Sequence, residues 1–167
     1  MRFFAWTLWL AVPPPPPSSR LELGRELAQE GRDLAAEGDY AGAVRAWESA
    51  LAVARKSVLQ QQSDNAEALD WMVDLCCESS RLRLKYLEDE NGARGDAWAA
   101  CVYTNYQRAA PLRCMMEVCQ ATEDAMGEYQ ALQHLLSLQN EDDKARAMLE
   151  ERSEELQDKM KKLYGTK

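Results

Sequence analysis

The stretch from Gly31 to Leu51 constrains the fold of this chain more than any other feature. Small and aromatic residues recur there at spacings of three or four, the period at which an α-helix repeats one face. Small side chains let two antiparallel helices approach closely, and the rings of Tyr40 and Trp47 fill the gaps that remain. The pattern consists of Gly31, Leu34, Gly38, Tyr40, Ala43, Trp47, Ala50 and Leu51. It predicts a helical hairpin with its turn at Gly38.

Length and composition fit one domain of this kind. The chain has 167 residues, 46% of them hydrophobic, which is enough for one proper core. Its net charge of -8, without a dense run of Lys and Arg, weighs against binding to nucleic acid, because phosphate neutralisation needs a basic stripe.

The cysteines form no recognisable framework. They number five, and all fall inside helical patterns: Cys76, Cys77, Cys101, Cys114 and Cys119. We expect buried, reduced thiols rather than disulfides. Because His134 is the only histidine, a Cys/His zinc site would be incomplete, and we expect neither a metal nor a cofactor.

Residues 1–19 differ from the rest. Arg2 precedes about ten apolar residues, and Pro13–Pro17 follow. The apolar run is shorter than the about twenty residues that span a bilayer. Its length and positive start suit a secretory signal, but Trp9 makes a poor cleavage context. We expect an unstructured leader, such as an alternative start of a longer protein, and keep a targeting or anchoring segment as the alternative. The prolines predict a stiff extended spacer.

Helical periodicity fills the remainder, residues 20–167. Ser19 and Glu22 fit a capping box, which predicts that the first helix begins at Ser19. The approximate hairpins span residues 24–57, 64–109 and 111–140, and a charged helix follows over 141–164. The fold class is therefore all-α.

The second and third hairpins are less regular than the first. We expect the helix after Ala66 to run to about Leu87 and the chain to break over Asn91–Gly95. Trp98, Cys101, Val102 and Tyr106 would then define the partner helix. Pro111 opens a helix whose inward candidates are Leu112, Met115, Met116, Cys119 and Ala125. Gly127 would mark a third turn, as Gly38 marks the first.

The stretch from Gly31 to Val53 resembles one tetratricopeptide repeat, with its small, Gly, Tyr, Ala, aromatic and Ala positions filled in register. The layout of three repeats and a longer charged helix is similar to the C-terminal domains of co-chaperones and large immunophilins. The resemblance implies a short solenoid of antiparallel hairpins, closed by a polar capping helix, whose concave groove binds a peptide or helix of a partner protein.

The resemblance also indicates groove residues. Chaperone-binding members hold a C-terminal carboxylate with a Lys and an Asn, and the matching positions here are Ala28 and Arg32; the corresponding second-repeat positions are Asp70 and Asp74. Of these positions, only the one occupied by Arg32 carries a positive charge. Arg25 and Arg32 are candidates to bind an acidic peptide, and Asp70 and Asp74 would adjust the charge of the groove. The alternative is that these four residues form a solvated charged face without a ligand.

No motif for catalysis is present: the chain has no Gly-rich phosphate loop, no Gly-x-Ser-x-Gly elbow and no His-Glu-x-x-His. We therefore expect a non-enzymatic, cytoplasmic adaptor. The alternatives are a membrane-tethered or secretory-pathway regulatory subunit and a short form of a larger immunophilin-like protein. The oligomeric state and the identity of the partner stay open.

Overall fold

The computed structural model describes residues 17–61, 66–138 and 143–165, and all regular structure in these ranges is helical. The elements are α1 (Pro17–Glu37), α2 (Tyr40–Gln61), α3 (Ala66–Leu82), the π-helical turn η1 (Arg83–Leu87), α4 (Glu90–Tyr103), α5 (Ala109–Ala121), α6 (Ala125–Ser137) and α7 (Asp143–Tyr164). The expected all-α class is confirmed for the described part of the chain.

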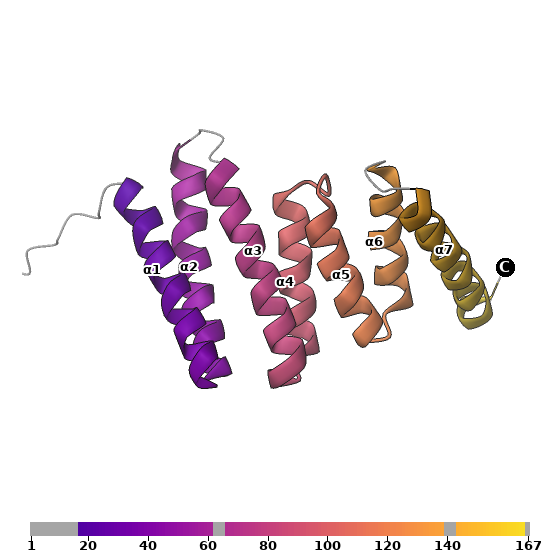
Figure 1. Cartoon of the computed structure of the whole chain (residues 1–167), viewed down its shortest axis with the longest axis horizontal. Coiled ribbons are helices and arrows are strands. Elements are labelled where there is room, and N and C mark those ends of the chain that lie inside the picture. The colour runs from indigo at the N-terminus through magenta and orange to yellow at the C-terminus, as the bar shows by residue number, and fades with distance from the viewer. Residues whose placement is uncertain (1–16, 62–65, 139–142, 166–167) are drawn as a thin grey trace, which may run out of the picture.

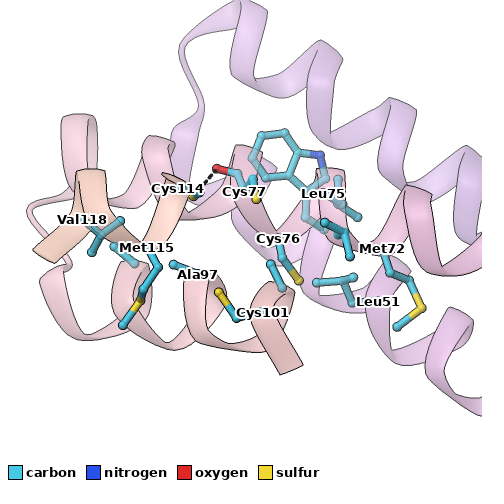
Figure 2. Packing of buried hydrophobic residues seen from close by; sticks show 14 of the residues in the cluster. Leu51, Met72, Leu75, Cys76, Cys77, Ala97, Cys101, Cys114, Met115 and Val118 are labelled. Carbon is cyan, nitrogen blue, oxygen red and sulfur yellow. Dashed lines mark hydrogen bonds between the residues drawn. The ribbon is translucent and has the colours of Figure 1, made fainter. Parts of the chain in front are cut away.

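The helices lie side by side in chain order, in a row from α1 to α7 (Figure 1). Helices α1 and α2, α3 and α4, and α5 and α6 pack as three successive hairpins, and α7 packs against α6. One apolar cluster runs through all three hairpins. Figure 2 shows its middle, where side chains such as Leu51, Cys76 and Cys101 come from neighbouring hairpins. The core is therefore continuous along the row.

The first hairpin closes around Gly31 and Trp47. A Cβ atom on Gly31 would lie 2.3 Å from the Trp47 indole, so only glycine lets the ring cross α1 at this point. The indole N–H donates to the Ala28 carbonyl at 3.1 Å, and Trp47 is only 3% exposed. Ala43 and Ala50 of the same pattern are fully buried, while Leu34 and Tyr40 are half-buried.

Each hairpin turns in the same way. A residue with left-handed backbone precedes an aspartate, whose carboxylate caps the next helix by accepting the N–H of a glycine three residues later. The three turns are Gly38–Asp39–Gly42 (φ 89°, 2.8 Å), Glu88–Asp89–Gly92 (φ 53°, 2.9 Å) and Glu123–Asp124–Gly127 (φ 55°, 3.0 Å). The repeated signal in the sequence is therefore Asp-x-x-Gly.

This signal corrects two predicted turns. The second break lies at Glu88 and Asp89, so residues 91–95 belong to α4 and do not interrupt the chain. The third lies at residues 122–124, so Gly127 is in the first turn of α6, and Ala125 is buried in α6 rather than α5. Both predictions were wrong because they assumed that glycine is the turn residue. In these two turns the glycine lies in the next helix, and its backbone N–H donates to the capping aspartate.

The π turn lengthens the second hairpin by one residue. The Asp89 N–H bonds the Arg83 carbonyl, six residues back, whereas the N–H groups of Asp39 and Asp124 each bond a carbonyl five residues back. Such insertions widen a helix locally without ending it. The predicted continuation of this helix to about Leu87 is thus confirmed.

Helix α1 begins at Pro17, two residues before the predicted cap, so Ser19 lies inside the helix and the capping-box prediction is wrong. Proline suits this place because the first N–H groups of a helix have no intrahelical acceptor. Predictions for residues 1–16, and for the junctions at 63–65 and 140–142, lie outside the described residues.

Helix α7 is fastened to α6 through a buried carboxylate. Glu128 is 3% exposed and accepts hydrogen bonds from the Arg152 guanidinium at 2.8 and 3.1 Å. These bonds to Glu128, with a further bond to Glu155, raise the pKa of Arg152. Leu156 of α7 is buried, but Leu163, seven residues later on the same side of the helix, is 61% exposed. The last turn of α7 therefore extends past the array.

Candidate functional site

The first helices of the three hairpins, α1, α3 and α5, are joined by ion pairs along one charged face. These pairs are Arg25–Glu67 (2.5 Å), Arg32–Glu78 (3.0 Å) and Arg81–Glu117 (2.8 Å), and Arg108 at the start of α5 pairs with Asp70. Every partner is at least 39% exposed at its side chain. Such exposed pairs contribute about 0–1 kcal/mol each to the free energy of folding. They therefore favour this alignment of the helices but leave the surface accessible to a ligand.

The four predicted groove residues all lie on α1 or α3. Arg32 makes two hydrogen bonds to the Glu78 carboxylate, both 3.0 Å, and these raise its pKa above the usual arginine value. Arg25 and Asp70 are also paired. Asp74 is exposed, and no cation of the described residues pairs with it directly. An incoming anion would therefore compete with Glu67 or Glu78 for the two arginines.

A hollow of about 380 Å³ opens beside Arg32, between α1, α2 and α3. Its walls are Arg32, Ala35, Trp47, Glu78, Arg81, Leu82, Lys85 and Tyr86. Trp47 and Leu82 supply an apolar floor, and three cations stand around it with one carboxylate. This combination suits a segment that inserts an apolar side chain and places an acidic group beside it.

Tyr86 forms the far wall of this hollow. It stacks on Tyr40 with ring centroids 3.9 Å apart, and the Lys85 ammonium lies 4.9 Å from its centroid. A hydrogen bond from Lys85 lowers the pKa of Tyr86. The pair thus presents an ordered aromatic edge with a positive charge over it.

Sequence reasoning missed three members of this site: Glu78, Arg81 and Lys85. Arg32 precedes Asp39 by seven residues, and Arg81 precedes Asp89 by eight, the difference being the extra residue of the π turn. The Asp-x-x-Gly turns are therefore the signal that would have aligned the two arginines.

A second hollow lies between α4, α5 and α6 and has a volume of about 360 Å³. Its walls are Trp98, Cys101, Tyr106, Leu112, Met115, Gly127, Gln130, Ala131 and His134. Tyr106 meets Trp98 edge-on at 5.6 Å and stacks on His134 at 4.6 Å between centroids. A further hollow of about 390 Å³ adjoins it, sharing Trp98, Met115, Gly127 and Gln130. We call the two together the α4–α6 cleft.

Of the residues expected to define the partner helix, Trp98, Cys101 and Val102 lie in α4, which ends before Tyr106. Cys101 is buried, but Trp98 is 46% and Val102 50% exposed, and Tyr106 lies beyond the helix end with φ 59°. Of the inward candidates on α5, Leu112, Met115 and Cys119 are buried and Met116 is half-buried. No helix of residues 17–61, 66–138 or 143–165 covers Trp98 and Val102, which periodicity alone does not reveal.

The five cysteines are buried and free, and burial raises the pKa of Cys76 and Cys101 to about 12. Protonated thiols of this kind are poor nucleophiles and poor metal ligands. Within residues 17–61, 66–138 and 143–165, no group of three or more His, Cys, Asp or Glu side chains is placed to hold a metal ion.

No protein-family model matches the sequence, and no curated protein matches it significantly. Among the helices of the described residues, none has the length and apolarity needed to cross a membrane.

Proposed function

We propose that this chain is a tetratricopeptide-type array that binds a segment of a partner protein on the face formed by α1, α3 and α5. Its role is that of a non-catalytic, cytoplasmic adaptor. The observation that carries the proposal is the hollow at Arg32, where three cations surround an apolar floor at the junction of the first two hairpins.

Three further observations support the tetratricopeptide assignment. Helical hairpins follow one another in a row, each turning through the same Asp-x-x-Gly device. The small-for-large packing of Gly31 against Trp47 is what the repeat signature implies. A charged helix, α7, closes the end of the row, as a solenoid requires.

The partner chemistry follows from the charges around the hollow. Arg32, Arg81 and Lys85 outnumber Glu78 there, although the whole chain carries a net charge of -8. An acidic segment is therefore attracted to this place and repelled elsewhere. The exposed ion pairs exchange readily, so a ligand carboxylate can replace Glu78 on Arg32 at small cost. Adaptor function requires nothing more than this reversible exchange.

The test uses the full chain in quantitative affinity capture from native extract. Wild type is compared with Arg81→Glu/Lys85→Glu and with Arg146→Glu, an exposed change on α7 that serves as control. We expect at least one protein to be lost about tenfold with the groove variant and retained with the control. A synthetic acidic segment of that protein should then bind wild type and fail to bind the groove variant. If no captured protein distinguishes the two variants, the adaptor proposal is refuted.

A further inference from the structure

The α4–α6 cleft shares no lining residue with the hollow at Arg32 and leaves large apolar side chains uncovered. Trp98, Val102 and Met126 are each between 45% and 50% exposed. Met126 and Trp98 line the same hollow, and Val102 stands one helical turn from Trp98 on α4. A contiguous aromatic and apolar surface of this kind is typical of a binding site rather than of ordinary protein surface.

The cleft also holds a polar group without an acceptor. The Nε of Arg94 is buried and makes no hydrogen bond within the described residues, and its guanidinium reaches Asp124 only at 3.6 Å. The Arg94 side chain lines the cleft and is 38% exposed, so its outer N–H groups are accessible to a ligand that brings an oxygen acceptor. A peptide backbone supplies carbonyl oxygens at every residue. The cleft is thus suited to an apolar peptide segment.

The chain itself contains such a segment, residues 3–10, which we call the apolar leader. It holds both phenylalanines of the protein and two of its five tryptophans, and it contains no acidic residue. Arg2 is the only charged side chain in residues 1–16, whereas the rest of the chain is acidic overall. Charge therefore does not oppose its approach to the helical array.

The length of chain before α1 allows contact with the cleft. Helix α4 lies three helices from α1 in the row (Figure 1), roughly 30 Å at about 10 Å per packed helix. Trp6 precedes Pro17 by eleven residues, and an extended chain of that length spans roughly 36 Å. Phe3 and Phe4 reach further still. Because the segment is tethered, its effective concentration at the cleft is on the order of millimolar.

We propose that the apolar leader docks in the α4–α6 cleft of its own chain, placing aromatic side chains against Trp98 and Tyr106. The cleft is then an intramolecular docking site, independent of the groove on α1, α3 and α5.

Site-directed crosslinking in the full chain tests this. Ala5→Cys is paired with Gln130→Cys in the cleft, or with Gln29→Cys on α1 as the matched control, and treated with a short bismaleimide. Gln29 is nearer to the leader along the chain, so random collision crosslinks the control better. We expect the reverse, with the Gln130 pair giving at least fivefold more intramolecular product by mass spectrometry. Ala5→Cys alone measures any reaction with the native thiols.

Trp98→Ala completes the test, because Trp98 is exposed and its loss leaves the core intact. It should lower the Gln130 crosslink several-fold and leave the Gln29 product unchanged. Equal or greater product at Gln29, no effect of Trp98→Ala, or a Gln130 product found only between two chains would each overturn same-chain docking.

Discussion

The first and second hairpins occupy equivalent places in the row but are held together by different chemistry. In the first, the bulky Trp47 fills the space that Gly31 leaves open. In the second, the residue in the place of Trp47 is Ala97, and Ser80 stands where Gly31 would be, its hydroxyl donating to the Ala93 carbonyl at 2.7 Å. The same arrangement of two helices thus accommodates a glycine beside a tryptophan in the first hairpin and a serine with an alanine in the second.

The second hairpin compensates for its smaller side chains with a polar network. Arg83, in the π turn, binds Asp89 at 2.6 Å and Asp96 at 2.9 Å, and it also pairs with Glu48 of α2. Ser79 donates to Asp96 at 2.6 Å. A helical hairpin of this shape therefore does not require a buried tryptophan at this position when side-chain hydrogen bonds hold its helices together.

Removal of the ring in the first hairpin should have the largest effect on stability. Trp47→Ala deletes a side chain that is 3% exposed and leaves a cavity, so we expect a loss of about 3–5 kcal/mol in the free energy of unfolding. Urea titration followed by circular dichroism measures it. A loss under 1 kcal/mol would mean that the two hairpins do not differ in the way described.

In the second hairpin, removal of the Arg83 guanidinium should be the corresponding destabilising change. Arg83→Met keeps the aliphatic stem but leaves Asp96 largely buried without its cation, and we expect a cost of about 2–3 kcal/mol. Burial already raises the pKa of Asp96. Asp96→Asn in the Arg83→Met background should therefore recover part of the loss, and failure to recover would contradict the network.

Gly31→Ala probes how closely the two helices approach. The new methyl group would clash with the Trp47 ring, so we expect a cost of about 1–3 kcal/mol, against the usual helical gain from alanine. In a Trp47→Ala background the clash with the ring is gone and only the Ala43 carbonyl, 3.0 Å from the new methyl group, stays close, so the same change should cost much less than in wild type. The double-mutant cycle in urea measures this coupling, and simple additivity would exclude the contact.

The all-α class and the first hairpin could be predicted because their signals are local. Spacing identifies which residues share a helix face, and Gly38 with its left-handed backbone marks the turn. The later turns failed because Glu88 and Glu123 adopt left-handed backbone without being glycine. Only the aspartate cap was common to all three.

The candidate sites were harder to predict because they depend on which helices become neighbours. Arg32 was identified by its register in the family resemblance, but its partner Glu78 lies 46 residues away. Trp98 fits the helical spacing of its neighbours, yet in the part of the chain that the structure describes no further helix covers that side of α4. Sequence periodicity reports a shared face and not what packs against it.

Asp89→Asn should isolate the charge at the cap of α4. Asparagine still caps, so the change removes only the negative charge that Arg83 and the helix N-terminus favour, and we expect a loss of about 0.3–1 kcal/mol at pH 7. The Gly92 N–H and Arg83 lower the pKa of Asp89 in the fold. Its contribution is therefore complete above the ordinary aspartate pKa of about 4 and disappears as pH falls through the folded pKa. Urea titrations at pH 7 and pH 2.5 should show the difference between variant and wild type shrinking in acid, whereas a constant difference would assign the loss to geometry.

The Arg32–Glu78 pair should give the smallest effect, and it tests whether the junction of the two hairpins serves binding rather than stability. Both side chains are 39% exposed, so a double-mutant cycle with alanine should give a coupling of about 0.2–1 kcal/mol in urea, decreasing in high salt. The charge swap Arg32→Glu/Glu78→Arg should restore most of that coupling because the two groups still meet. It also moves the cation from α1 to α3, so a segment captured through Arg32 should bind the swapped chain at least fivefold more weakly despite its normal stability. If the coupling instead exceeds about 2 kcal/mol and binding survives the swap, the pair is structural and the groove must be sought elsewhere on the array.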